Sequence, residues 1–299
     1  GQERKSRAEK EPGRKRAGDK TQKKAGRAGR GRREVEKMRD GMRLYGHYVS
    51  IHVKSMMQYK SSFLLAVTGQ FLVSFNVFLG MFFMFQRFSA VGGFTYSQVL
   101  LCFAIFLMEF SLAECIARGF DTFSGMVRKG EFDRVMVRPR GLVMQVLGSR
   151  FELTRIGRML QALVMFVYGV RKSGVPWDIP RVLTVAFMLA GGTALFFGIF
   201  LVGASLCFFT LESLEIMNIF TDGAREFGRY PAGVYGKRFL QFCTFVVPYG
   251  LVQHYPLLFL LGKRDEVWWM FVPLLAFFFV IPCYGIWRVG VRKYQSAGS

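Results

Sequence analysis

The sequence is poor in acidic residues, in histidine and in clustered cysteine, and each scarcity excludes a kind of site. Only 20 of the 299 residues are Asp or Glu, against 41 Lys and Arg, and only three are His. The cysteines lie singly in apolar runs, without the Cys-x-x-Cys spacing of metal and redox motifs, at Cys102, Cys115, Cys207, Cys243 and Cys283. We therefore expect free buried thiols, with no disulfide and no metal ligand.

Motifs for nucleotide binding and for hydrolysis are also absent from the sequence. It has no GxxxxGK[ST] phosphate-binding loop, no HExxH zinc motif and no GxSxG nucleophile motif. The chain is therefore not expected to be an enzyme, to bind ATP in the P-loop manner, or to carry a cofactor.

Long apolar runs are what the sequence has instead, since 52% of its residues are hydrophobic. A membrane-spanning helix needs about 20 such residues to cross a hydrocarbon core of ~30 Å. The runs predict an all-α integral membrane protein with about six transmembrane helices, at Ser62–Phe85, Val99–Ala117, Phe151–Val170, Val182–Phe209, Phe239–Leu261 and Val267–Val289.

Two of these predicted spans are irregular. The third has only twelve uncharged residues, Met159–Val170, and reaches full length only if Arg155 and Arg158 snorkel toward the cytoplasm. The fifth contains Pro248 and Pro256, which remove backbone donors, so the part after Pro248 is expected to be a short re-entrant or external helix.

The segment before the first span divides into two parts. Residues 1–41 are rich in Lys, Arg, Gly and Ala without apolar periodicity, so we expect disorder and no signal peptide. Such a basic arm could bind nucleic acid or anionic lipid, but we favour an inert extension and expect no specific nucleic-acid partner. Residues 42–294 form the predicted membrane domain, with an amphipathic interface helix at Leu44–Ser61, and 295–299 are a C-terminal tail.

Basic residues predict the orientation of the spans. The segment Arg118–Arg158 carries nine Lys and Arg against four acids, an excess typical of the cytoplasmic side. The second polar segment, Glu212–Arg238, is assigned to the same side, and both basic termini are expected in the cytoplasm. Loops near Gly92, Trp177 and Lys263 are then external.

Two acids lie within the predicted second span, at Glu109 and Glu114. A carboxylate in lipid is costly, so each is expected to face protein or water. Two interpretations remain open, a role in translocation and an interhelical or helix-end contact, and we favour the structural one.

The charged loop Arg118–Gly141 has features of two short helices. Phe123 and Met126 belong to an apolar stripe with helical spacing, and Gly130 can end that helix in the left-handed region. A second helix, Glu131–Val137, must stop before Pro139, because a residue preceding proline disfavours helical dihedrals.

This loop resembles the first cytoplasmic loop of ABC-2 type transporter permeases, a family of bacterial exporters. The family pattern I/V-R-x-G-E-x-D-x-x-L-x-R-P is matched here except for Met136, which stands where Leu is usual. The matching residues are Val127, Arg128, Gly130, Glu131, Asp133, Arg134, Arg138 and Pro139. A later signature of the same family resembles Phe227, Gly228, Arg229, Tyr230, Pro231 and Tyr235, followed by Pro248, Tyr255 and Pro256.

The resemblance implies a permease subunit in the bacterial cytoplasmic membrane that a separate ATPase drives, with ATP bound by that partner. It also implies a second permease subunit, identical or paralogous, and a coupling loop carried by Phe123, Met126, Arg128, Gly130, Glu131, Phe132, Asp133, Arg134, Arg138 and Pro139.

Alternatives remain for the loop and for the whole chain. A basic loop suits anionic lipid, but Glu131 and Asp133 gain nothing from such a surface, whereas a protein partner can use both signs of charge and can bury Phe132. For the chain, the alternatives are an ion-gradient-driven secondary transporter and a non-transporting membrane scaffold.

Overall fold

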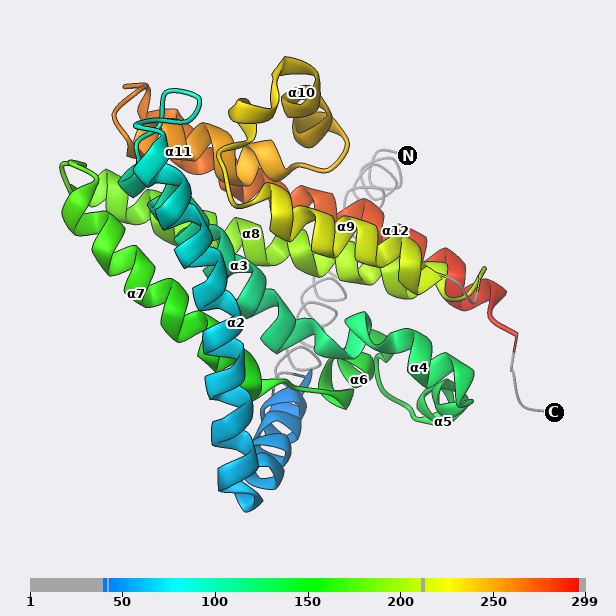
Figure 1. Ribbon diagram of the computed structural model, residues 1–299. Coiled ribbons are helices and arrows are strands. Elements are labelled where there is room, and N and C mark those ends of the chain that lie inside the picture. The colour runs from blue at the N-terminus through cyan, green and yellow to red at the C-terminus, as the bar shows by residue number, and fades with distance from the viewer. Residues whose placement is uncertain (1–39, 42, 211–212, 296–299) are drawn as a thin grey trace, which may run out of the picture. The chain divides into compact units, whose positions relative to one another are not determined.

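The computed structural model describes residues 40–41, 43–210 and 213–295, and every regular element in these ranges is a helix (Figure 1). The chain divides into two compact units, Gly1–Ser50 and Ile51–Ser299, and the account below concerns the second. The predicted disorder of residues 1–41 falls almost wholly outside the described residues. A helix is present where the interface helix was expected, since residues 43–58 are helical.

The second unit contains five of the six predicted spans as long helices. They are α2 (Lys60–Arg87), α3 (Tyr96–Asp121), α7 (Ile156–Lys172), α8 (Ile179–Leu206) and the continuous pair η4 (Val267–Leu275) and α12 (Ala276–Lys293). Within the described ranges five helices are long and apolar enough to cross a membrane, or six if one sharply bent pair is counted as a span. The predicted all-α membrane architecture is confirmed.

Helix α3 is the centre of this unit and is buried along most of its length. Glycines on its neighbours allow backbones to approach it closely, because a side chain there would overlap an atom of α3. Gly169 of α7 lies against Leu101, where an added Cβ would be 3.1 Å from the Leu101 Cβ. Gly192 of α8 lies against the carboxylate of Glu109 in the same way.

The third span differs from its prediction in the placement of its arginines. Arg158 is buried and forms an ion pair with Glu114 of α3, and Arg155 lies 3.5 Å from the same carboxylate. Both guanidiniums also donate to Gln70 Oε1 of α2, at 3.2 Å from Arg155 and 3.1 Å from Arg158. The prediction of snorkelling was therefore wrong, because an acid on the adjacent helix provides a closer partner than water does.

The segment Glu212–Arg238 also differs from its prediction. It forms α9 (Ser213–Phe227) and the short η2 (Ala232–Tyr235), and α9 runs antiparallel to α3. Gly228 lies against the ring of Phe106, while the Arg225 guanidinium lies 5.2 Å from the centroid of Phe110, one turn farther along α3.

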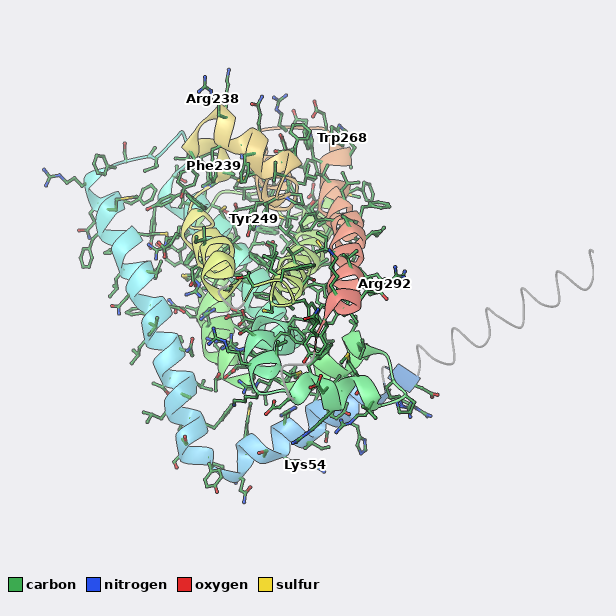
Figure 2. The ribbon with its side chains drawn as sticks, turned by 90° about the vertical axis from the view of Figure 1, so that its right-hand side faces the viewer. Lys54, Arg238, Phe239, Tyr249, Trp268 and Arg292 are labelled. Carbon is green, nitrogen blue, oxygen red and sulfur yellow. The ribbon has the colours of Figure 1, made fainter. Side chains whose placement is uncertain are left out.

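The far end of this segment reaches the loop between α2 and α3. A Cβ added at Gly92 would be 2.8 Å from Val234, and the hydroxyl of Tyr230 donates to the sulfur of Met84 at 3.3 Å. Arg238 accordingly projects from the α10 end of the unit (Figure 2). Placing the whole of Glu212–Arg238 on one side with Arg118–Arg158 was therefore wrong.

The predicted fifth span is broken into short helices. They are α10 (Lys237–Phe245), the π-helix η3 (Gly250–His254) and α11 (Tyr255–Leu260), and the first is bent by 103° against the rest. The break falls at Pro248, as the missing backbone donor predicts. These short helices lie at the same end of the unit as the loop between α2 and α3, since Lys263, just after α11, donates to the carbonyl of Gly93 at 2.7 Å.

Candidate coupling site

The charged loop folds as two short helices, α4 (Phe123–Arg128) and α5 (Glu131–Val137), followed by α6 (Leu142–Ser149). Gly130 separates the first two with φ of 66°, a left-handed conformation that favours glycine. Arg138 is extended, with ψ of 135°, as expected of a residue before proline. The helix boundaries in this loop thus match those that the sequence predicts.

An aromatic cluster lies beneath α4 and α5. Its members are Phe123, Phe132, Phe208, Trp287 and Tyr294. The ring of Phe123 lies 5.0 Å from Phe132 and 5.1 Å from Trp287, and Phe132 lies 5.1 Å from Tyr294. Edge-to-face pairs at such separations add to the stabilisation from buried area. The cluster joins the loop to α12 and to the end of α8.

Phe123 and Phe132 are both 0% exposed, so neither ring is available to another protein. The expectation that a partner buries Phe132 was wrong. The apolar stripe of the loop is real, but periodicity identifies only which face is buried, and the chain's own α12 covers it.

The opposite face of the loop is exposed and carries both signs of charge. Exposed side chains on or beside α5 include Glu131, Arg134 and Arg138, with Arg128 at the end of α4. Two apolar side chains are exposed among them, Met136 at 39% and Val137 at 86%. Asp133 and Met126 are half-buried, and Pro139 is exposed.

Val137 was not selected by sequence reasoning. It is the last residue of α5 and the most exposed large hydrophobic side chain described in the unit. An available signal was the spacing from Phe132, because a residue five positions later on a helix points to a different face.

The second sequence signature assembles at the other end of the unit. The ring of Phe227 lies 5.5 Å from that of Tyr235, and Gln253 donates to the carbonyl of Gly228 at 3.1 Å. Arg229 pairs with Glu226 at 2.6 Å, and Tyr255 stacks on Trp269 at 4.9 Å. Burial raises the pKa of Tyr235 to about 12. This set therefore braces α9 against the broken helices.

Pro231, Pro248 and Pro256 have local roles within that assembly. Pro231 precedes η2, Pro248 lies at the bend between α10 and η3, and Pro256 lies in the first turn of α11. In the part of the chain that the structure describes, no group of three or more His, Cys, Asp or Glu could hold a metal ion.

Comparison with known proteins gives one family. A family model described as ABC-2 family transporter protein matches residues 71–298 of the chain. Searches of curated proteins and of solved structures found no significant match.

Proposed function

Because this chain belongs to the ABC-2 family of transporter proteins, and is therefore a multi-pass membrane permease, we propose that it is the permease of an ATP-driven exporter. A separate ATPase subunit binds the exposed face of α4 and α5. The permease works as a pair, with an identical or paralogous second copy, in the bacterial cytoplasmic membrane with both termini in the cytoplasm.

The observation that carries this proposal is the two-sided construction of α5. Its outer face presents Glu131, Arg134 and Val137, while its inner face buries Phe132 in the aromatic cluster. A protein surface can complement both signs of charge and cover an exposed valine, whereas an anionic lipid surface repels Glu131.

The aromatic cluster supports a route from the ATPase to the spans. Packed rings resist deformation, so a displacement of α5 is passed on to whatever the rings contact. Phe132 contacts Tyr294 just beyond α12, and Phe123 contacts Trp287 within it. Phe120, on the last turn of α3, lies 5.3 Å from the same tryptophan. A push on α5 by a closing ATPase is thus delivered to α12 and α3 together.

An ion-gradient-driven mechanism draws less support from the described residues. Glu114, one of its two candidate proton carriers, is paired with Arg158 and lies within 3.5 Å of Arg155. Protonating it would leave the buried Arg158 and the partly buried Arg155 without their counter-ion. Its role is then to hold α3 against α7.

The test is association with the partner ATPase. Glu131→Lys reverses one exposed charge on α5, so we expect weaker co-purification and uncoupled ATP hydrolysis at unchanged membrane levels. Asp265→Lys is the matched control, because Asp265 is also exposed but lies in the loop after α11, at the opposite end of the unit. Equal ATPase recovery with both variants would contradict the proposal and indicate that α5 faces the lipid surface instead.

A further inference from the structure

Two cavities follow one another between α3 and α9, and their linings differ in chemistry. The first, the arginine cavity, has a volume of about 590 Å³ and is lined by Arg118, Arg150, Arg155, Arg158 and Arg225. The second, the apolar pocket, has a volume of about 230 Å³ and is lined mainly by apolar side chains, among them Phe106, Ala224, Phe227, Phe242 and Val247.

The same two helices form a wall of both cavities. On α3, Phe110 lines the arginine cavity and Phe106, one turn away, lines the apolar pocket. On α9, Arg225 lines the arginine cavity and Ala224 lines the apolar pocket. One helical turn is about 5.4 Å, so the two linings lie within the length of one alkyl chain of each other.

The arginine cavity has an excess of positive charge. Its five arginines face three acids, Glu114, Asp121 and Asp222, which leaves two positive charges in excess among the lining residues. Arg150 makes no ion pair with any described residue, and the Nε–H groups of Arg155 and Arg225 are buried without a hydrogen-bond acceptor there. Buried donors of this kind favour a ligand that supplies acceptor oxygens.

The arginines are held in place before any ligand arrives. Glu114 and Gln70 fix Arg158 from two sides, and Arg158 and Arg225 lie 5.7 and 5.2 Å from the centroid of the same ring, Phe110. Guanidiniums stacked on an aromatic ring lose little conformational freedom on binding. Ser124 and Gly125 of α4 also line this cavity, which connects it to the coupling loop.

From this arrangement we infer that the permease carries an amphipathic anion, which seats a phosphate or carboxylate head in the arginine cavity and an alkyl chain in the apolar pocket. The inference rests on the proposed transport function, since it names the substrate class. Exposed apolar side chains, Ile219 at 71% and Phe242 at 47%, border the pocket and give the chain a way in.

The experiment measures binding to the permease alone, so its result does not depend on ATPase coupling. The protein in phosphatidylcholine nanodiscs is titrated with dodecyl phosphate by calorimetry, with protein-free nanodiscs as the blank. Dodecyltrimethylammonium has the same chain and the opposite charge. We expect dodecyl phosphate to bind at least tenfold more tightly, and equal affinities would overturn the inference.

Variants test each cavity separately. Arg150→Gln and Arg225→Gln each remove a charged donor, so each should weaken dodecyl phosphate binding about tenfold. Arg288→Gln is the control, because Arg288 is exposed on α12 and lines neither cavity. Arg150 lies outside the helices and makes no ion pair with a described residue, so its variant should fold normally. Parent-like affinity in both variants would overturn the assignment of the head group.

The apolar pocket is tested with alkyl phosphates of increasing length. Each buried methylene should raise affinity about fourfold until the pocket is full. Ala224→Leu fills part of the pocket and should flatten this dependence while leaving short alkyl phosphates unaffected. A length dependence identical to that of the parent would overturn the placement of the chain.

A final arm identifies the source of the amphiphile. If phosphatidylglycerol in the nanodisc displaces dodecyl phosphate, the permease draws its substrate from the bilayer. If it does not, the amphiphile enters from solution. Both outcomes support an amphipathic anion. Loss of ATPase association in the Glu131→Lys variant with intact dodecyl phosphate binding would separate a fault in coupling from a fault in this site.

Discussion

Replacing Phe132 by alanine removes a fully buried ring from the aromatic cluster beneath α5. The ring contacts Phe123, Phe208 and Tyr294 at centroid separations of 5.0, 5.5 and 5.1 Å. Truncating a buried phenylalanine costs about 3–5 kcal/mol, from lost transfer free energy and the cavity left behind. That loss falls on the attachment of α5, because the ring joins this helix to α12.

The assay is hydrogen exchange of the α4 and α5 backbone amides in nanodiscs. A loss of about 3 kcal/mol corresponds to roughly 150-fold less protection, at 1.36 kcal/mol for each factor of ten. Phe132→Leu should lose far less, since it leaves a smaller cavity. Phe245→Ala is the control, because Phe245 is 85% exposed on α10 and its removal leaves no cavity.

The reasoning would be refuted by one pattern of results. If Phe132→Ala left protection of α4 and α5 unchanged but abolished ATPase association, the ring would be an anchor for the partner. Unchanged protection with unchanged association would show that the aromatic cluster does not hold α5 at all.

Three further predictions concern the spans. Glu114→Gln leaves Arg155 and Arg158 without their counter-ion and should destabilise the protein by about 3–5 kcal/mol. The double variant Glu114→Gln with Arg158→Met should recover part of this loss. Thermal unfolding measures the stability of both variants. Gly192→Leu forces a side chain into the carboxylate of Glu109 and should prevent α8 from packing on α3. The expected result is a loss of folded protein after extraction from the membrane. Gly285→Leu is the control and should fold, because there is open space around Gly285. Cysteines at Lys263 and Arg238 should be labelled from the same side of the membrane, and a cysteine at Lys129 from the other. Labelling of Arg238 and Lys129 from one side would contradict the antiparallel α9.

Helix existence and many helix ends could be predicted because they depend on local chemistry. Gly130 adopts φ of 66° and Arg138 is extended before Pro139, as the residue types require. The long apolar runs likewise became α2, α3, α8 and α12. These features need only a short window of sequence.

The placement of Glu212–Arg238 could not be predicted in this way. The charge of this segment favours a position on one side of the membrane, yet α9 passes Phe110 of α3 while carrying Asp222 and Arg225, and Gly228 beyond it lies against Phe106. Those charges line the arginine cavity, which forms only once α2, α3, α7 and α9 have come together. The sequence of one helix alone contains no information about a cavity that several helices form.

The candidate site also has a part that the sequence predicts and a part that it does not. Sequence resemblance identified the charged residues of α4 and α5, several of which are exposed. It did not reveal that Phe123 and Phe132 are covered by Trp287 and Tyr294, more than 150 positions later in the chain. Long-range partners of an apolar face follow from tertiary packing, which periodicity does not contain.

The central claim, that α5 binds the ATPase, is tested most directly by site-specific photo-crosslinking in membranes. A photoreactive residue at Val137, which is 86% exposed at the end of α5, should crosslink to the ATPase subunit, and the yield should fall when Glu131→Lys is added. The same residue placed at Ile179, 77% exposed at the start of α8, should give no ATPase adduct. Lipid adducts alone at Val137, in cells that contain the assembled transporter, would contradict the claim.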